Sequence, residues 1–136
     1  MTIARVIATK TVHDVVTCDA ATPVSQAVAM LAERRIGALP VHDGDRIVGI
    51  FSERDVIYTI AKGGAAALDR PVSEVMTAPA ITVSPDTSVL SALSLMTKRR
   101  IRHLPVTNDG RTVGFISIGD LVKYRIDHIE IGRAHV

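Results

Sequence analysis

The chain is poor in aromatic residues and in cysteine. Its 136 residues include two tyrosines, two phenylalanines and no tryptophan. So few aromatic rings argue against a stacking platform for single-stranded nucleic acid. A single cysteine rules out a disulfide within the chain. No apolar stretch reaches membrane-spanning length, and the first six residues do not read as a secretory leader. We therefore expect a cytoplasmic protein.

The chain also lacks a large excess of either positive or negative charge. Sixteen Lys and Arg face fourteen Asp and Glu, for a net charge of +2. The longest basic run is Lys98-Arg99-Arg100, so duplex DNA binding is not favoured. Hydrophobic residues make up 47% of the chain, enough for a buried interior. Cys18 follows an apolar, strand-like stretch and is predicted to be a buried structural thiol.

Residues for catalysis or metal binding do not form a recognisable set. The histidines show no metal-ligand spacing, and one cysteine cannot complete a thiolate site. No serine has a histidine at a matching position in both halves of the chain. We therefore expect no enzyme, no metal site and no catalytic cofactor. The five histidines are His13, His42, His103, His128 and His135.

What the chain does contain is a repeat. Residues 17–57 align with residues 82–122 at an offset of 65 without a gap, and 15 of the 41 positions are identical. Both copies carry Arg-Arg-Ile, then Leu-Pro-Val, then Val-Gly-x-x-Ser-x-x-Asp. Two copies of this length are not a solenoid. The simplest interpretation is two copies of one unit about a pseudo-twofold axis, so binding sites should come in pairs.

Each copy alternates strands and helices, which predicts an α/β fold built from two βαββα repeats. In the first copy we expect a strand at Val15–Thr17, followed by a helix that Thr22 caps and Gly37 ends. A hairpin that turns at Asp43-Gly44-Asp45 and a helix over Glu53–Lys62 complete this copy.

In the second copy we expect a strand at Ile81–Val83, followed by a helix over Ser88–Arg100. A hairpin that turns at Asn108-Asp109-Gly110 and a helix from near Ser117 complete it.

The predicted boundaries place repeat 1 at 7–64, a linker and lead-in at 65–79, repeat 2 at 80–126 and a C-terminal tail at 127–136. Within the connecting segment, Gly63–Val72 is expected to be a linker and Ser73–Thr77 a short helical lead-in. Ile126, Ile129 and Ile131 could extend the last helix or pack on a partner, and Gly132–Val136 could fray.

The strongest local motif is Gly-h-x-Ser-x-x-Asp, where h is hydrophobic. It occurs at residues 49–55 and again at residues 114–120. A serine at a helix N-cap with an acid three residues later resembles a capping box, which is a purely structural role. The same pair also suits a nucleotide, because a helix N-terminus favours a phosphate and a carboxylate can accept two hydrogen bonds from a ribose diol.

With the Leu-Pro-Val segments and the repetition added, the sequence resembles the cystathionine β-synthase (CBS) domain family, as a stand-alone tandem pair, or Bateman module. The likeness covers about Val6 to Tyr124. It implies a disc-shaped module that binds adenosine derivatives (AMP, ADP, ATP, NAD or S-adenosylmethionine) in clefts between the two repeats. It also implies association as a homodimer through helical faces.

The resemblance assigns the ligand contacts position by position. It implies that Asp55 and Asp120 hold ribose hydroxyls and that Ser52 and Ser117 bind phosphate, with Arg54 adding a charge-assisted contact. Adenine would lie near Val16, Thr17, Thr77, Ile81 and Thr82. The loop before Leu-Pro-Val, close to the phosphates in the family, carries Ala38 in one copy and Arg102 with His103 in the other.

The expected function is therefore a regulatory module that senses adenine nucleotides and acts on a protein partner. Because the copies draw positive charge from different positions, the two sites could differ in affinity or ligand. One alternative is a dimeric interaction module whose Ser/Asp pairs serve only as helix caps. Another is a weak nucleic-acid binder that uses residues 98–100.

Overall fold

The computed structural model describes the backbone of residues 1–10 and 15–134, with side chains up to residue 128. The fold is mixed α/β, and the chain divides into two compact units. Unit 1 comprises Met1–Val15 and Thr82–Val136, and unit 2 comprises Val16–Ile81. Unit 2 thus holds the first repeat. Unit 1 holds the second repeat together with the N-terminal segment.

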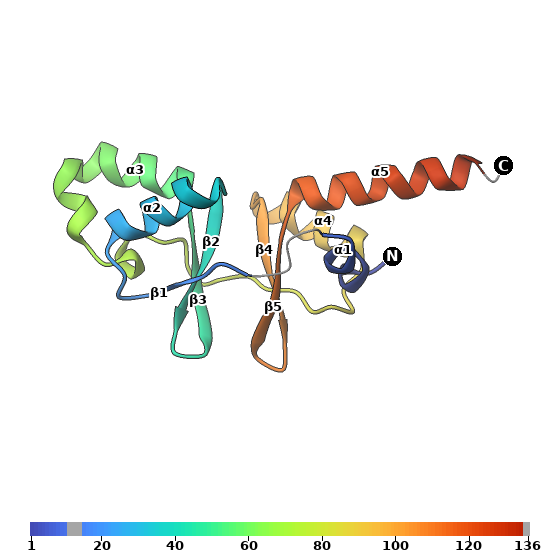
Figure 1. Ribbon diagram of the computed structural model, residues 1–136, viewed down its shortest axis with the longest axis horizontal. Helices are drawn as coiled ribbons and strands as arrows, with labels where there is room; N and C mark the ends of the chain where they lie inside the picture. The colour runs from blue at the N-terminus through green and yellow to red at the C-terminus, as the bar shows by residue number, and fades with distance from the viewer. Residues whose placement is uncertain (11–14, 135–136) are drawn as a thin grey trace. The chain divides into compact units, whose positions relative to one another are not determined.

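Unit 2 is a small sheet covered by two helices on one side (Figure 1). Strand β1 is parallel to β2, and β2 is antiparallel to β3, giving the order β1-β2-β3. Two short 3₁₀ helices, η1 and η2, follow the last helix. The elements are β1 (Cys18–Asp19), α2 (Val24–Arg34), β2 (Ala38–Asp43), β3 (Arg46–Ser52), α3 (Glu53–Gly63), η1 (Gly64–Asp69) and η2 (Val72–Glu74).

The core of unit 2 lies between α2 and the sheet. Val24, Ala27 and Leu31 recur at helical spacing and are buried, as the sequence pattern predicts. They pack in one cluster with Leu39, Val41, Phe51 and Val72 from the rest of the unit. Cys18 belongs to the same cluster, which confirms the prediction of a buried structural thiol.

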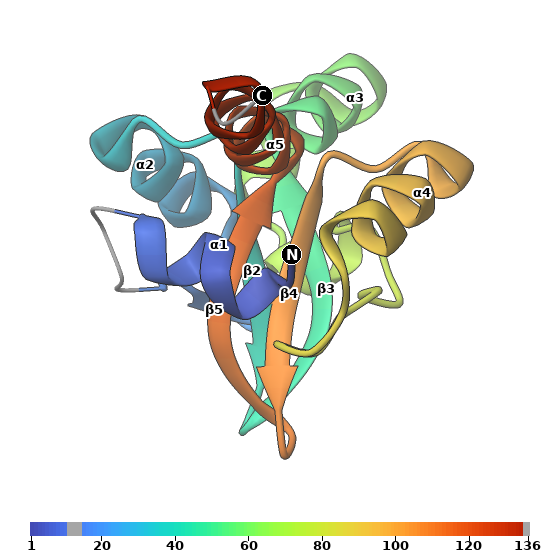
Figure 2. The same ribbon diagram turned by 90° about the vertical axis from the view of Figure 1, so that its right-hand side faces the viewer.

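Unit 1 is built on a two-stranded hairpin. Helices α1 and α4 lie over the same face of the hairpin, and α5 continues from the end of β5 (Figures 1 and 2). The hairpin order is β4-β5. The elements are α1 (Ile3–Thr9), α4 (Val89–Arg99), β4 (His103–Asn108), β5 (Arg111–Ser117) and α5 (Ile118–Ala134).

Helix α1 is an integral part of unit 1. The side chains of Ile3 and Val6 on this helix are buried. Its first turn is also tied to the segment before α4, because the Ile3 N–H donates to the Thr87 carbonyl at 2.8 Å and the Ala4 N–H to the Pro85 carbonyl at 2.9 Å. The sequence offered no clear signal for this helix, since it is short and lies outside the repeat.

The repeat extends to the register of the two hairpins. Ala38 pairs with Ser52 in unit 2, and His103 pairs with Ser117 in unit 1, at the offset of 65 found in the sequence. A β-bulge interrupts both ladders at equivalent places, after Val41 and after Val106. Both predicted turns are confirmed.

The predicted first strands are wrong in extent. The only paired residues of β1 are Cys18 and Asp19, rather than Val15–Thr17. In unit 1, Val83 alone forms a bridge, with Val106, where we expected a strand at Ile81–Val83. The β-branched residues in these segments favour extended backbone. The register, however, places Thr17 opposite Pro40 and Thr82 opposite Pro105, and proline has no N–H to donate to a ladder.

The connecting and terminal segments are more regular than the sequence indicates. The predicted linker Gly63–Val72 contains η1, with Ala67 buried, and the expected helical lead-in is a 3₁₀ turn beginning at Val72. Helix α5 continues to Ala134, so Ile126, Ile129 and Ile131 extend the last helix. The last two residues of the predicted tail lie outside the described part. No helix in the described part has both the length and the apolar character needed to cross a bilayer.

Helix α2 differs from the sequence prediction at both ends. Its N-cap is Pro23 rather than Thr22. Its left-handed C-cap is Arg35 rather than Gly37, and Arg100 takes the same role after α4, with φ of 53° and 54°. An arginine in this region suffers crowding at its Cβ that glycine avoids.

We therefore expect Arg35→Gly to raise the free energy of unfolding by roughly 0.5–1 kcal/mol, net of the larger entropy that glycine gives the unfolded chain. Urea denaturation measures it. The matched control is Gly44→Ala: Gly44 has φ of 63° and no atom within 4 Å of an added Cβ, so only backbone strain changes and stability should fall. A destabilised Arg35→Gly protein would contradict this account.

Candidate functional site

The Ser/Asp pair of unit 2 forms a complete capping box where β3 ends and α3 begins. Ser52 is the N-cap in extended backbone, and its Oγ accepts a hydrogen bond from the Asp55 N–H at 3.3 Å. In return, Oδ2 of Asp55 accepts from the Ser52 N–H at 2.9 Å. The structural role proposed for the motif is therefore present, and it fixes the carboxylate at the start of the helix.

The Asp55 carboxylate also binds a segment far away in the sequence. Its Oδ1 accepts a hydrogen bond from the Thr77 hydroxyl at 3.1 Å. Thr77 is held in place by two backbone hydrogen bonds with Ile50, both 2.9 Å long. Thr77 was assigned to the site from the family resemblance, and the structure brings it to Asp55.

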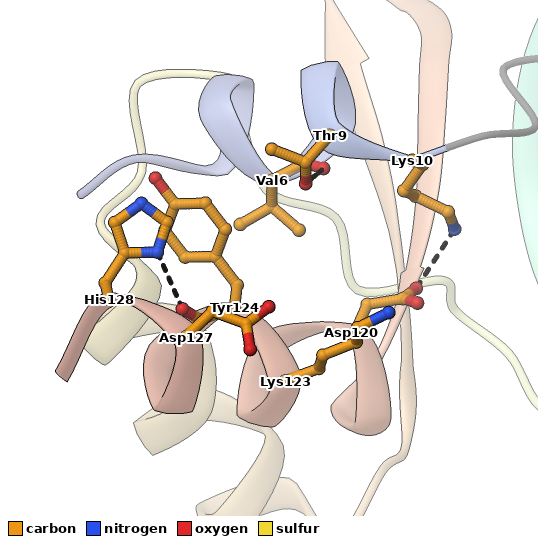
Figure 3. A pocket seen from close by; sticks show the side chains of 8 residues that line it. All are labelled: Val6, Thr9, Lys10, Asp120, Lys123, Tyr124, Asp127 and His128. Atoms are coloured by element: carbon orange, nitrogen blue, oxygen red, sulfur yellow. Dashed lines mark hydrogen bonds and ion pairs between the residues drawn. The ribbon is translucent and has the colours of Figure 1, made fainter. Parts of the chain in front are cut away.

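Unit 1 repeats the pair, with a different partner. The Ser117 N–H donates to Oδ2 of Asp120 at 2.9 Å, and the Asp120 N–H donates to Oγ of Ser117 at 3.1 Å. Here the distant partner is Lys10, the C-cap of α1. Its Nζ lies 3.0 Å from Oδ2 of Asp120 (Figure 3) and donates to the Phe115 carbonyl at 2.9 Å.

The electrostatics of Asp120 follow from these contacts. Partial burial of the carboxyl favours its neutral form, but the Ser117 N–H and the Lys10 ammonium stabilise the charged form more strongly. The net result is that the pKa of Asp120 lies below its ordinary value. The side chains of Lys10 and Asp120 are 31% and 30% exposed, so solvent weakens this ion pair without removing it.

The glycine of the motif gives the distant segments room to approach the strand. A Cβ on Gly49 would lie 2.5 Å from the Met76 sulfur and 2.8 Å from the Thr77 carbonyl oxygen. A Cβ on Gly114 would lie 2.7 Å from Cδ1 of Ile7 on α1. The segments that deliver Thr77 to Asp55 and Lys10 to Asp120 therefore both depend on a strand residue without a side chain.

The other predicted phosphate contacts lie around these junctions. Ala38 is buried opposite Ser52, and the exposed Arg54 precedes Asp55. In unit 1, the Arg102 carbonyl accepts from the Ile118 N–H at 2.8 Å, and its side chain is exposed. His103 lies opposite Ser117, with its ring stacked on Phe115 at 5.4 Å.

The predicted adenine contacts are less well connected. Val16, Thr17 and Ile81 are half-buried, and Thr82 is exposed. The described hydrogen bonds and ion pairs do not link these four residues to either Ser/Asp pair, so their role stays a prediction. Within the described residues, no group of three or more His, Cys, Asp or Glu could hold a metal ion. His13 and His135 lie outside those residues.

Sequence reasoning missed Lys10 and the pocket beside it. A cavity of about 360 Å³ lies between α1 and α5, and we call it the α1–α5 pocket (Figure 3). Lys10 precedes the aligned repeat, so the alignment gave no reason to single it out. The lining residues are Val6, Thr9 and Lys10 from the α1 side and Asp120, Lys123, Tyr124, Asp127 and His128 from α5.

Cys18 is not a reactive residue of the candidate site. Burial, followed by the nearby charge of Asp19, raises the pKa of the Cys18 thiol to about 11. The thiol therefore stays protonated at neutral pH and is a poor nucleophile.

Comparison with known proteins identifies the repeat. The family model described as "CBS domain" matches residues 5–62 and 72–127. A CBS-domain containing protein of Agrobacterium tumefaciens has a similar crystal structure, with a TM-score of 0.85 and 37% identity, covering 91% of this chain and 92% of that one. The fold predicted from the sequence is thereby confirmed.

Two further proteins are similar to this chain. A mitochondrial CBS domain-containing protein of Arabidopsis thaliana is 38% identical in an alignment of 111 residues that covers 78% of this chain and 54% of that protein. This chain thus spans about half the length of that relative. The CBS domain pair of protein MJ0100, solved in complex with 5-methylthioadenosine and S-adenosyl-L-methionine, has a TM-score of 0.79 at 23% identity, covering 91% of this chain and 98% of that one.

The lowered pKa of Asp120 predicts a pH-dependent stability. The unfolded chain binds a proton at this group more readily than the folded chain, so the carboxylate stabilises the fold above its ordinary pKa of 3.8 and loses that contribution as the pH falls through the folded value. The stability difference between the wild type and Asp120→Asn should therefore be constant from pH 5 to 7 and shrink below about pH 4. Urea titrations at each pH measure it, and a difference independent of pH would contradict the expectation.

Proposed function

The chain belongs to the CBS domain family, and from that premise we propose that it is a regulatory module that binds an adenosine derivative at its two Ser/Asp pairs. The observation that carries the proposal is the twofold occurrence of the same arrangement: a hydroxyl and a carboxylate fixed at a helix N-terminus. Free N–H groups and positive potential at such an end favour phosphate, and a carboxylate accepts hydrogen bonds from a sugar diol.

In this proposal the carboxylates of Asp55 and Asp120 bind ribose hydroxyls, and the hydroxyls of Ser52 and Ser117 bind phosphate. The ligand displaces or shares the hydrogen bonds that the carboxylates make in its absence. In unit 2 this affects the Thr77 hydroxyl, which lies 3.1 Å from Asp55. Asp120 is bonded to Lys10 instead, so the two sites bind with different affinities.

The residues around each pair complete the proposed contacts. Arg54 contributes to the phosphate site of unit 2. Arg102 and His103 contribute to that of unit 1, where they flank the strand-to-helix junction. Ala38, opposite Ser52, leaves space at the corresponding position in unit 2. Adenine is contacted by the segments that contain Val16, Thr17, Ile81 and Thr82.

The ligand class is AMP, ADP, ATP, NAD or S-adenosylmethionine. The complex of the MJ0100 domain pair with 5-methylthioadenosine and S-adenosyl-L-methionine supports an adenosine ligand as a class. The module itself catalyses no reaction in this proposal. Instead, binding shifts its conformational population, which requires the ligand to bind one state more tightly than the other. A protein partner responds to that shift.

A specific observation also favours the alternative of an interaction module with vestigial sites. The capping box at Ser52 and Asp55 is complete without any ligand, and the hydroxyls and carboxylates already have partners. A pair retained only as a helix cap would have the same geometry. The two hypotheses differ in what a ligand does to the protein.

A thermal-shift panel with AMP, ADP, ATP, NAD, NADH, S-adenosylmethionine and GMP tests the proposal. A ligand at about 100 times its dissociation constant stabilises the native state by roughly 2.7 kcal/mol, because it binds the folded chain alone. For a domain of this size we expect the melting temperature to rise by several degrees with adenine compounds and not with GMP. No shift with any adenine compound would contradict the proposal.

Alanine substitutions separate binding from capping. If the carboxylates bind ligand, Asp55→Ala and Asp120→Ala should each weaken affinity, whereas loss of a cap by itself costs roughly 1 kcal/mol of stability. The matched control is Ser88→Ala. Ser88 caps α4 through the Ser91 N–H and lies outside both pairs, so the substitution should lower stability and leave ligand affinity unchanged.

We also propose that the protein is a homodimer that associates through helical faces. Helix α3 has no buried residue, and it exposes Ile57, Tyr58 and Ile60 at 65%, 59% and 43%. Helix α5 exposes Val122 and Ile126. Apolar side chains of this size are stabilised when a second surface covers them.

Ile57→Asp should therefore shift the protein from dimer to monomer, because a carboxylate in an apolar interface is left without compensating partners. Light scattering after size exclusion gives the mass directly. Lys62→Asp is the control on the same helix, at an exposed polar position that should leave the dimer intact. A wild-type protein that is already monomeric at micromolar concentration would overturn this proposal.

A further inference from the structure

The two carboxylates are reached by segments that are attached to their strands in different ways. In unit 2, Thr77 forms two backbone hydrogen bonds with Ile50, both 2.9 Å long, and its hydroxyl donates to Oδ1 of Asp55 at 3.1 Å. In unit 1 the residue at the position of Ile50 is Phe115, 65 residues later. The group that meets the Phe115 carbonyl is the ammonium of Lys10, at 2.9 Å. Among the described residues, no backbone hydrogen bond joins the end of α1 to β5, so a side chain takes the place of backbone contacts.

Lys10 also fills an acceptor site that a sugar diol would use. Oδ2 of Asp120 accepts the Ser117 N–H at 2.9 Å, a bond that belongs to the helix cap, and it accepts Nζ of Lys10 at 3.0 Å (Figure 3). Each carboxylate oxygen offers about two acceptor sites, so these two donors fill Oδ2. A diol that donates one hydrogen bond to each oxygen therefore needs the site that Lys10 fills.

The charge of Lys10 makes it a stronger competitor than the corresponding group of unit 2. The ammonium adds the attraction of opposite charges to its hydrogen bond, whereas the Thr77 hydroxyl is neutral. The side chains of Lys10 and Asp120 are 31% and 30% exposed, so water screens the pair and keeps its strength close to that of a surface ion pair. A contact of this strength lowers the affinity of a ligand for Asp120 and can still be displaced by it.

Helix α1 is anchored at its two ends by separate sets of contacts. Its first turn is held by the backbone hydrogen bonds from Ile3 and Ala4 to the segment before α4, and Ile3 is buried. Its other end is the C-cap Lys10, whose side chain reaches Asp120 and the Phe115 carbonyl. Loss of the Lys10 contacts therefore loosens the C-terminal end of α1 and leaves the first turn docked.

We propose that Lys10 is an autoinhibitory contact: its ammonium competes with the ribose of the ligand for Asp120, and ligand binding in unit 1 releases the C-terminal end of α1. This inference rests on the proposed function and deepens it, since it names the contact that a ligand must break and the element that responds. By linkage, the factor by which Lys10 weakens ligand binding equals the factor by which the ligand weakens the Lys10 contact. In unit 2 the same exchange leaves the segment in place, because backbone hydrogen bonds hold Thr77 when its hydroxyl is displaced.

The first test is titration calorimetry with adenosine and with AMP on the full chain carrying Asp55→Asn, so that the site of unit 1 dominates the signal. Lys10→Met keeps an apolar side chain of similar length and removes the competing ammonium. Adenosine, which carries the ribose and no charge, should then bind roughly two- to fivefold more tightly, the effect expected from loss of a partly exposed ion pair.

Lys123→Met is the matched control. Lys123 lines the same pocket as Lys10 and is exposed, and within the described side chains it forms no ion pair. Its substitution removes the same charge near Asp120 without removing a competitor, so adenosine affinity should stay unchanged. AMP is an anion and loses attraction in either variant, so its affinity for Lys10→Met should exceed that for Lys123→Met by the same factor. Melting temperatures show whether each variant is folded.

The second test follows the Lys10 amine itself in the chain that carries only Asp55→Asn. A brief reaction with an acetylating ester, followed by proteolysis and mass spectrometry, gives the rate at each lysine. An amine held by two acceptors reacts slowly, so Lys10 should react about twofold faster or more when adenosine saturates the site and releases it. Lys62 and Lys98, which are exposed at the ends of α3 and α4, should react at unchanged rates. Because this measurement leaves Lys10 intact, it decides the question even where Lys10→Met is unstable.

The outcomes distinguish this inference from the proposed function. Unchanged or weaker adenosine binding by Lys10→Met, or unchanged or slower acetylation of Lys10 with adenosine bound, would overturn the autoinhibitory contact and leave the proposed function standing. Asp120→Asn tests the function itself, since it should weaken both ligands. If Asp120→Asn leaves both affinities unchanged, or if the Asp55→Asn chain binds neither ligand, then the proposed function fails at this site and the autoinhibitory contact fails with it.

Discussion

A carboxylate at the start of a helix organises each unit. Asp55 and Asp120 each accept a hydrogen bond from the backbone of the preceding strand, and each also binds a residue from a distant part of the chain. The carboxylate thus joins a strand, a helix and a third segment at one point. Satisfying a helix N-terminus and tethering a remote segment need the same acceptor, which explains why one residue type stands at both junctions.

This shared use makes the proposed binding function compatible with the structural one. A group held by several hydrogen bonds is already oriented, so a ligand that binds it loses less conformational freedom. A ligand bound as proposed would share or replace these bonds. In unit 2 it would change the contact of Thr77, which lies before the second repeat, and in unit 1 the contact of Lys10, the C-cap of α1.

Much of the fold and the centre of the site could be predicted from the sequence. The helices followed from apolar spacing, the hairpin turns from glycine and acidic residues, and the Ser/Asp pairs from a motif that occurs twice. These features occur in both copies of the repeat, 65 residues apart. The same offset separates the β-bulges after Val41 and Val106, although no local sequence pattern indicates a bulge there.

The remaining features depend on long-range packing, for which the sequence has no local signal. Helix α1 is short, and its burial is against residues more than 80 positions away. Lys10 looks like any surface lysine until that docking brings it to Asp120. The left-handed arginines at 35 and 100 are a related case, because the backbone path imposes a conformation that the side chain disfavours.

The discontinuity of unit 1 has a consequence for the order in which the chain folds during synthesis. All residues of unit 2 leave the ribosome as one continuous stretch, so this unit can close while the remainder is still being made. Helix α1 is made before unit 2, whereas the other part of its own unit, residues 82–136, is made after unit 2. The apolar face of α1 therefore stays uncovered while the whole of unit 2 is synthesised and folds. A factor that protects nascent chains would find an exposed apolar helix at this stage.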